Sequence, residues 1–289
     1  MLSLLAAAGE APAPIYWVEL GLTRGIDLGF FTIRWYSLAY LAGILLAYWH
    51  TLKSIKAPGA PLAQRHADDL FFYCTLGVIV GGRLGYATFY SPGLWTHPLE
   101  LFKVWQGGMS FHGGLIGTTI AIAWVCWRGG LSFLRVCDYI SVAVPFGMLF
   151  GRLANFVNGE LWGRVAGEGV RWAMIFPDAP DQLPRHPSQL YEAALEGLAL
   201  LVLLMLLFWK TRARFRPGLL VGTFGCGIAL ARFTVEFFRE PDAQLLAFAQ
   251  QTGLSMGQWL TIPLFVAGAF LVIRALVKPE LGSTVPPPA

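Results

Sequence analysis

The chain has 289 residues, of which 56% are hydrophobic and only 13% are charged, with a net charge of +4. A soluble domain carries about 25% charged residues, so this chain has too few to cover a globular surface. Its apolar content excludes a disordered chain, its four cysteines are too sparse for a disulfide scaffold, and its charge provides no basic patch for nucleic acid. The composition therefore indicates a polytopic membrane protein, and the mean hydropathy of +0.57 agrees.

Seven apolar stretches are long enough to form helices that cross a bilayer, which takes about 20 residues. They cover residues 31–50, 70–90, 111–128, 136–157, 189–209, 219–238 and 259–277. The mixed, proline-containing segment 158–187 predicts a small head outside the membrane, between the fourth and fifth spans. The proline-rich residues 282–289 predict a disordered tail. We expect an all-α integral membrane protein, with residues 1–289 in a single polytopic domain.

The lysines and arginines of the connecting segments predict the orientation, because they concentrate on the cytoplasmic side. Eleven lie on one side of the predicted spans and six on the other. Much of the smaller group lies in the long head, which counts less. The densest run, Lys210 to Arg216, follows the fifth span. We therefore expect this run and the C-terminus in the cytoplasm, and the N-terminus and head outside.

Four arginines remain inside the predicted spans: Arg34, Arg83, Arg152 and Arg232. A charge inside a bilayer is costly, so each marks a candidate functional site. With the predicted orientation these arginines fall in the outer half of the membrane. The other polar groups expected there are Tyr36, His112, Gln189, Tyr191, Glu192, Glu236 and Arg239. Because a guanidinium fork matches phosphate oxygens and stays charged, the cluster indicates an anionic lipid headgroup as ligand.

Two glycine-rich patches add to this cluster. One places His112 between glycine pairs at the outer end of the third span, where a histidine can act as a general base. The other, residues 150–164, carries Arg152 and Asn155 three residues apart, on one helical face. Glu160 lies just past Gly159, where the helix is expected to stop. Arg232 and Glu236, four residues apart, can form an ion pair.

The second patch also carries a family resemblance. Residues 151–164, Gly-Arg-Leu-Ala-Asn-Phe-Val-Asn-Gly-Glu-Leu-Trp-Gly-Arg, resemble the hallmark segment of prolipoprotein diacylglyceryl transferases. Four further segments resemble the family in the same order along the chain. They are 81–86 (GGRLGY), 107–114 (GGMSFHGG), 186–192 (HPSQLYE) and 232–242 (RFTVEFFREPD).

The resemblance implies a bacterial inner-membrane enzyme with seven transmembrane helices, which uses no metal or nucleotide cofactor. Such an enzyme moves the diacylglyceryl group of phosphatidylglycerol, a membrane lipid, to the lipobox cysteine of a prolipoprotein signal peptide. The products are a thioether and glycerol phosphate, in the first step of lipoprotein maturation.

The motifs also imply roles for individual residues. His112, Arg152 and Arg232 are the expected catalytic residues, with His112 taking the thiol proton and the arginines stabilising the departing phosphate. The expected substrate-binding residues are Tyr36, Arg83, Tyr86, Asn155, Glu160 and Glu236. Some family members carry histidine where this chain has Arg34, and some carry tyrosine where it has Ile228.

Two other classes of function remain open on the sequence alone. A transporter of an anionic or phospholipid substrate would also place arginines and glycine-rich spans around a cavity. It would need a polar path to both faces of the membrane, whereas the polar groups here gather in one half. A structural membrane subunit would not need so many charges inside its spans.

Overall fold

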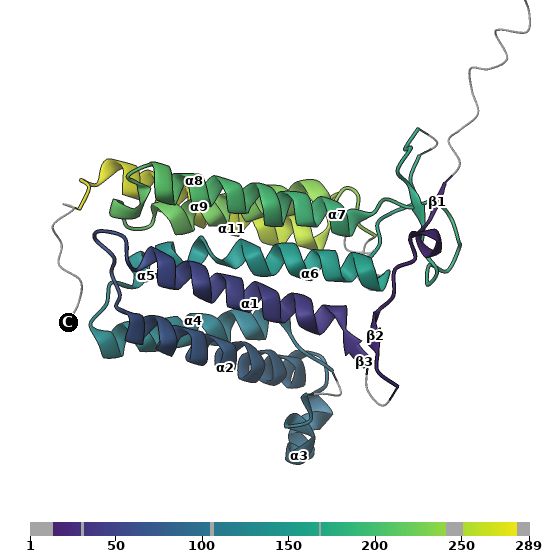
Figure 1. Ribbon diagram of the computed structural model, residues 1–289, viewed down its shortest axis with the longest axis horizontal. Helices are drawn as coiled ribbons and strands as arrows, with labels where there is room; N and C mark the ends of the chain where they lie inside the picture. The colour runs from purple at the N-terminus through teal and green to yellow at the C-terminus, as the bar shows by residue number, and fades with distance from the viewer. Residues whose placement is uncertain (1–13, 30–31, 105–106, 168, 241–250, 282–289) are drawn as a thin grey trace, which may run out of the picture.

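The computed structural model describes residues 14–29, 32–104, 107–167, 169–240 and 251–281. These residues form a bundle of long helices with short strands at one end (Figure 1). The predicted tail, 282–289, and the last two residues of the 232–242 motif lie outside the described residues.

Long helices coincide with all seven predicted apolar stretches. They are α1 (Trp35–Ser54), α2 (Gln64–Phe89), α4 (Phe111–Gly129), α5 (Phe133–Ser141), α6 (Val144–Asn158), α8 (Leu200–Lys210), α9 (Leu219–Val235) and α11 (Met256–Val277). Helix α7 (Ser188–Glu192) continues into α8 through a π-helical turn, η4 (Ala193–Ala199). The shorter helices are η1 (Trp17–Leu20), η2 (Pro92–Thr96), α3 (Pro98–Leu101) and η5 (Ala213–Phe215).

Four helical runs among the described residues are long and apolar enough to cross a membrane. They are Gln64–Phe89, Phe133–Asn158, Ser188–Lys210 and Met256–Val277, and Leu219–Val235 is a shorter apolar helix. Side chains such as Val266 and Phe270 on α11 remain exposed. Apolar helices with exposed apolar faces are what contact with lipid requires, so the chain is a helical membrane protein.

Some boundaries differ from the predicted ones for local reasons. Helix α2 begins six residues before the predicted span, in a polar turn where the His66 ring accepts the Ala63 backbone N–H at 3.1 Å. The fourth stretch breaks after Ser141, because Pro145 lies in the first turn of α6 and has no backbone N–H to donate. Helix α9 ends at Val235 rather than at 238.

Short strands depart from the all-α prediction. Strand β2 (Gly25–Asp27) pairs antiparallel with β3 (Thr32–Arg34), and β1 (Ile15–Tyr16) pairs parallel with β4 (Met174–Ile175). The β1–β4 pair ties the predicted head to the start of the chain, and a small core covers the join. This core contains Trp17, Met174, Phe176 and Ala179. An N-terminal segment thus packs on residues of the 158–187 segment, a contact that the sequence did not predict.

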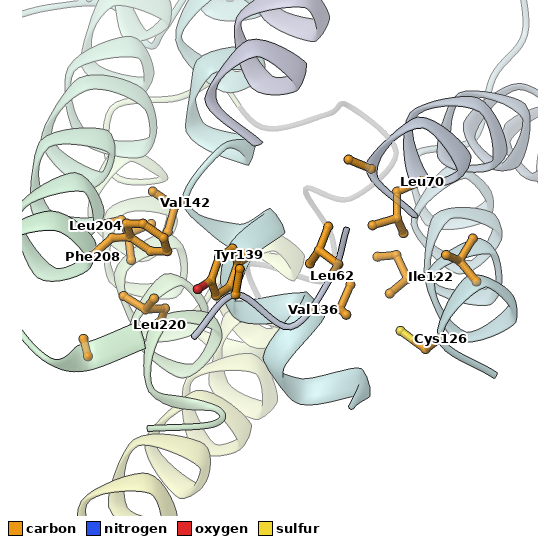
Figure 2. Packing of buried hydrophobic residues seen from close by; sticks show 14 of the residues in the cluster. Leu62, Leu70, Ile122, Cys126, Val136, Tyr139, Val142, Leu204, Phe208 and Leu220 are labelled. Carbon is orange, nitrogen blue, oxygen red and sulfur yellow. The ribbon is translucent and has the colours of Figure 1, made fainter. Parts of the chain in front are cut away.

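The helices stack in pairs, with α2 against α4, α1 against α6 and α9 against α11 (Figure 1). The main hydrophobic core lies toward the end away from the strands. Figure 2 shows Tyr139, Val142, Leu204, Phe208 and Leu220 in this core, and the Tyr139 and Phe208 rings meet edge to face at 5.0 Å. The starts of α1 and α7 and the ends of α2 and α6 lie at the strand-bearing end (Figure 1). The chain therefore brings the predicted polar groups to one end of the bundle.

Candidate active site

A network of charged side chains joins three helical segments near the strand-bearing end. Arg152 of α6 contacts Glu192 of α7 at 3.2 Å and Glu196 of η4 at 3.4 Å. Arg232 of α9 contacts the same two carboxylates, at 2.8 Å and 3.9 Å. Glu192 and Glu196 each bridge the two arginines, so the four side chains form a ring of alternating charge.

Two further residues extend this ring. Glu236 contacts Arg232 at 3.2 Å, which confirms the pairing expected from their spacing. Arg239 contacts Glu192 at 2.9 Å. We call these six residues the charged cluster: Arg152, Arg232, Arg239, Glu192, Glu196 and Glu236. Its three arginines and three glutamates balance, which is the condition for burying charges away from water.

The carboxylates of the cluster are more deeply buried than its arginines. The side chains of Glu192 and Glu196 are 0% and 1% exposed, whereas those of Arg152 and Arg232 are 23% and 26% exposed. The arginines therefore line the accessible side of the cluster, and the carboxylates hold them from behind. A preorganised pair of guanidinium groups with an open side is suited to an anion such as a phosphate.

The local fold explains how Glu196 reaches α6. The residue lies in the π-helical turn, a local widening of the helix that is common at functional sites. The next residue, Gly197, packs so closely on α6 that a Cβ there would lie 2.7 Å from the Leu149 Cα. A side chain at this position would push η4 away from α6 and separate Glu196 from Arg152.

Beside the cluster, the end of α6 carries the other predicted polar groups. Gly159 ends the helix with φ of 70°, as expected. The Asn155 amide donates to the Glu160 carboxylate at 2.8 Å, and the Asn158 amide donates to it at 3.3 Å. The Tyr36 hydroxyl lies 3.2 Å from the Tyr40 hydroxyl on α1, the helix that pairs with α6. Asn155, one turn after Arg152 on α6, thus holds Glu160 near the charged cluster.

Three predicted site residues lie instead on the α2–α4 pair. The buried Arg83 donates to the carbonyl oxygens of Glu100, Leu101, Gly107 and Gly108, at 2.6, 3.0, 2.6 and 3.2 Å. It therefore clamps the loop between α2 and α4. The Arg83 guanidinium lies 5.8 Å from the centre of the Tyr86 ring.

His112 is exposed in the first turn of α4, next to the Phe111 ring. The Ser110 hydroxyl caps this helix by accepting the Gly113 N–H at 3.3 Å. The cap fixes the backbone at the start of the helix and leaves the imidazole accessible. The ring can therefore meet a substrate, although it is not one of the six residues of the charged cluster.

Two hollows lie on either side of the α6 terminus. An apolar groove of about 480 Å³ runs between α1 and α6, where Trp35, Leu38, Phe150 and Leu153 line it. A polar pocket of about 320 Å³ lies at the β2–β3 hairpin. Its lining consists of Arg24, Thr32, Arg34, Asn158, Glu160 and Asp178. Residues that are adjacent in the chain line the two hollows. Trp35 and Val157 line the apolar groove, and Arg34 and Asn158 line the polar pocket, so the apolar surface lies next to the polar one.

A second set of ion pairs lies outside the predicted spans, at Arg185 of the 158–187 segment. Arg185 contacts Asp181 at 2.7 Å and Glu240 at 3.0 Å. The guanidinium hydrogen bond lowers the pKa of the Asp181 carboxyl below its usual range. Burial lowers the pKa of the His186 ring below its usual range.

Sequence reasoning missed Glu196, and it grouped Glu192 and Arg239 with the outer polar residues without assigning either to the site. A signal for Glu196 was present, because a glutamate in an apolar span is costly without a partner. Its position one turn beyond Glu192 directs it to the same side of the helix. The partners on α6 and α9 depend on helix packing, which local spacing does not give.

Comparison with known proteins places the sequence in a family. The family model described as prolipoprotein diacylglyceryl transferase matches residues 24–274. A phosphatidylglycerol–prolipoprotein diacylglyceryl transferase of Erythrobacter litoralis (strain HTCC2594) is 64% identical over 97% of this chain and 99% of its own length. Proteins of the same name from Zymomonas mobilis and Azospirillum brasilense are 55% and 49% identical, over 84% and 88% of this chain and 84% and 94% of their own lengths. The chain therefore belongs to the prolipoprotein diacylglyceryl transferase family.

Proposed function

We propose that this protein transfers the diacylglyceryl group of phosphatidylglycerol to the lipobox cysteine thiol of prolipoproteins. The observation that carries the proposal is the ring of Arg152, Glu192, Arg232 and Glu196, with its guanidinium groups on the accessible side. The names of the relatives supply the two substrates, and the cluster supplies a receptor for the phosphate of the lipid.

The reaction follows from the charges at this site. The thiol loses its proton, and the sulfur attacks the glycerol carbon that carries the phosphate ester. The carbon–oxygen bond breaks, a thioether forms, and glycerol phosphate leaves with the electron pair. Negative charge grows on the leaving group, where Arg152 and Arg232 stabilise it. In a site with little water, such preorganised charges contribute strongly to the rate.

His112 is the base in this proposal. A free thiol has a pKa of about 8.5, so removing its proton near neutral pH requires help. The exposed ring at the start of α4 is available to a thiol that arrives at this end of the bundle. Arg83 and Tyr86 act beside it, where the arginine orders the loop that borders the route to His112.

The remaining predicted residues position the lipid. Asn155 and Glu160 form a hydrogen-bonded pair at the polar pocket, and Tyr36 lies in the first turn of α1, the helix that pairs with α6. Such groups suit the hydroxyls of a glycerol headgroup, which can both donate and accept hydrogen bonds. Glu236 holds Arg232 through an ion pair with its Nη2 atom.

The same proposal places the protein in the bacterial inner membrane with seven spans. Seven spans result when α1, α4 and α9 are added to the four runs that are long and apolar enough by themselves. The run from Lys210 to Arg216 then faces the cytoplasm together with the C-terminus. The N-terminus, the 158–187 head and the charged cluster lie toward the outer face, where a translocated lipobox cysteine becomes accessible.

The test uses the purified full-length protein, phosphatidylglycerol and a synthetic lipobox peptide with one cysteine. Mass spectrometry of the peptide should show the gain of one diacylglyceryl group. A peptide with serine in place of cysteine should gain nothing. If folded protein leaves the cysteine peptide unchanged across several phospholipids, the transferase proposal fails. The charged cluster would then be better explained as the site of an anion or lipid transporter.

A further inference from the structure

Glu196 occupies a position that the proposed reaction leaves unexplained. Its two carboxylate oxygens face Arg152 at 3.4 Å and Arg232 at 3.9 Å. Glu192 bridges the same two arginines at 3.2 and 2.8 Å. Two carboxylates therefore compete for one pair of guanidinium groups, and Glu196 has the longer contacts of the two.

A phosphodiester resembles the Glu196 carboxylate in the property that matters here. Both groups carry one negative charge shared by two oxygens, and both can accept hydrogen bonds from two guanidinium groups at once. A phosphate that binds between Arg152 and Arg232 would take the contacts that Glu196 now makes. The shorter contacts of Glu192 would hold the arginines in place while the phosphate replaces Glu196.

Charge balance adds a second constraint. The cluster has three arginines and three glutamates, so an arriving phosphate leaves one excess negative charge in a buried site. The charged groups that face Glu196 are Arg152 from α6, Arg232 from α9 and Glu192 from the same helical run. Glu160, beyond the end of α6, is held by two asparagine amides. An unpaired buried carboxylate is costly, and binding a proton removes that cost.

We propose that Glu196 is a positioning residue that occupies the place of the lipid phosphate between Arg152 and Arg232, and that it takes up one proton when the phosphate displaces it. The proton comes from the solvent, and the glutamic acid stays buried behind the phosphate. One of its oxygens, Oε1, accepts no hydrogen bond within the described residues, so displacement costs the carboxylate only the hydrogen bond that Arg152 donates to Oε2. This inference rests on the proposed transferase function.

The test measures equilibrium binding of radiolabelled phosphatidylglycerol to the full-length enzyme in detergent, without peptide, between pH 5.5 and 8.5. If binding takes up one proton, the dissociation constant rises with pH, by up to tenfold per unit in the window of uptake. Glu196→Gln keeps the shape of the side chain and removes the titration. This variant should lose that pH dependence and should bind more tightly than the wild type at pH 8.

Two variants serve as controls. Glu196→Asp keeps the charge and should retain a rise with pH, whereas Glu19→Gln removes an exposed carboxylate in η1, outside the cluster, and should match the wild type. The histidines of the chain are present in every variant, so the difference between variants isolates position 196.

The proposal is overturned if folded Glu196→Gln keeps the slope of the wild type, or if it binds more weakly by the same factor at every pH, as a purely structural role would give. The transfer assay distinguishes a failure of the Glu196 role from a failure of the proposed function. If the wild type modifies the lipobox peptide but the slope is independent of position 196, only the role of Glu196 fails. If the wild type modifies nothing, the proposed function fails.

Discussion

At the scale of single residues, Glu192 is the centre of the charged cluster. It contacts Arg152, Arg232 and Arg239, although its side chain has no exposed area. Removing one partner from a buried ion pair leaves an uncompensated charge, which costs about 3–5 kcal/mol. Glu192 therefore has the largest structural role of the three glutamates.

We expect Glu192→Gln to lower the free energy of unfolding by about 3 kcal/mol or more, because three guanidinium groups lose their shared carboxylate. Thermal unfolding of the detergent-purified protein measures this. Glu19→Gln, at an exposed position in η1, is the matched control and should unfold like the wild type. Equal unfolding midpoints for the two variants would show that the arginines do not depend on Glu192.

Residue chemistry made part of the site predictable. Arg152, Arg232 and Glu236 stand out because charges are rare in apolar spans, and Arg232 and Glu236 also pair at helical spacing. Arg83 stood out for the same reason. In the structure, Arg83 donates four hydrogen bonds to carbonyl oxygens between α2 and α4. Its role in binding substrate therefore stays a prediction. Sequence reveals that a charge needs partners, but it does not identify distant ones.

At the scale of elements, glycines set the contact between α2 and α4. Each helix has two glycines four residues apart, Gly77 and Gly81 on α2 and Gly113 and Gly117 on α4. A Cβ on Gly113 would overlap the Gly81 carbonyl, and one on Gly117 would overlap the Gly77 carbonyl. Small residues at this spacing let membrane helices approach closely. The contact also fixes the position of His112 at the start of α4.

Gly113→Ala should therefore force α4 away from α2, at a cost of about 1–3 kcal/mol, and should reduce transfer by moving His112. The transfer assay and thermal unfolding of the same preparation measure both effects. Gly147→Ala is the control, because a Cβ there has no heavy atom within 4 Å. If Gly113→Ala matches this control in stability and activity, the close glycine contact does not hold the pair together.

Element boundaries were predictable where apolar character ends abruptly. Helix α4 begins at Phe111, as expected, after a glycine-rich segment and a serine cap. The start of α2 was missed because its first turns are polar, and strands of two or three residues are too short to leave a pattern. The π-helical turn was also missed. It lies inside an apolar run and depends on packing against α6 at Gly197.

At the scale of the whole molecule, topology explains why one end of the bundle carries the polar groups. Alternating helix directions bring the starts of α1 and α7 and the end of α6 to the strand-bearing end (Figure 1). Counting spans was enough to predict this convergence. The pairing of β1 with β4, between residues 15 and 175, was not predictable, because it joins short segments about 160 residues apart in the chain.

The most direct test of the account is the rate of diacylglyceryl transfer to a lipobox peptide by Arg152→Ala, compared with Arg212→Ala. Arg212 lies after α8, outside the candidate site, and its side chain is 66% exposed, so its loss should leave most of the activity. Losing a preorganised charge at the departing phosphate costs about 10²–10³ in rate. We therefore expect Arg152→Ala to be at least that much slower, at an unchanged yield of membrane-inserted protein. Full activity in Arg152→Ala would contradict the assignment of the charged cluster as the site of transfer.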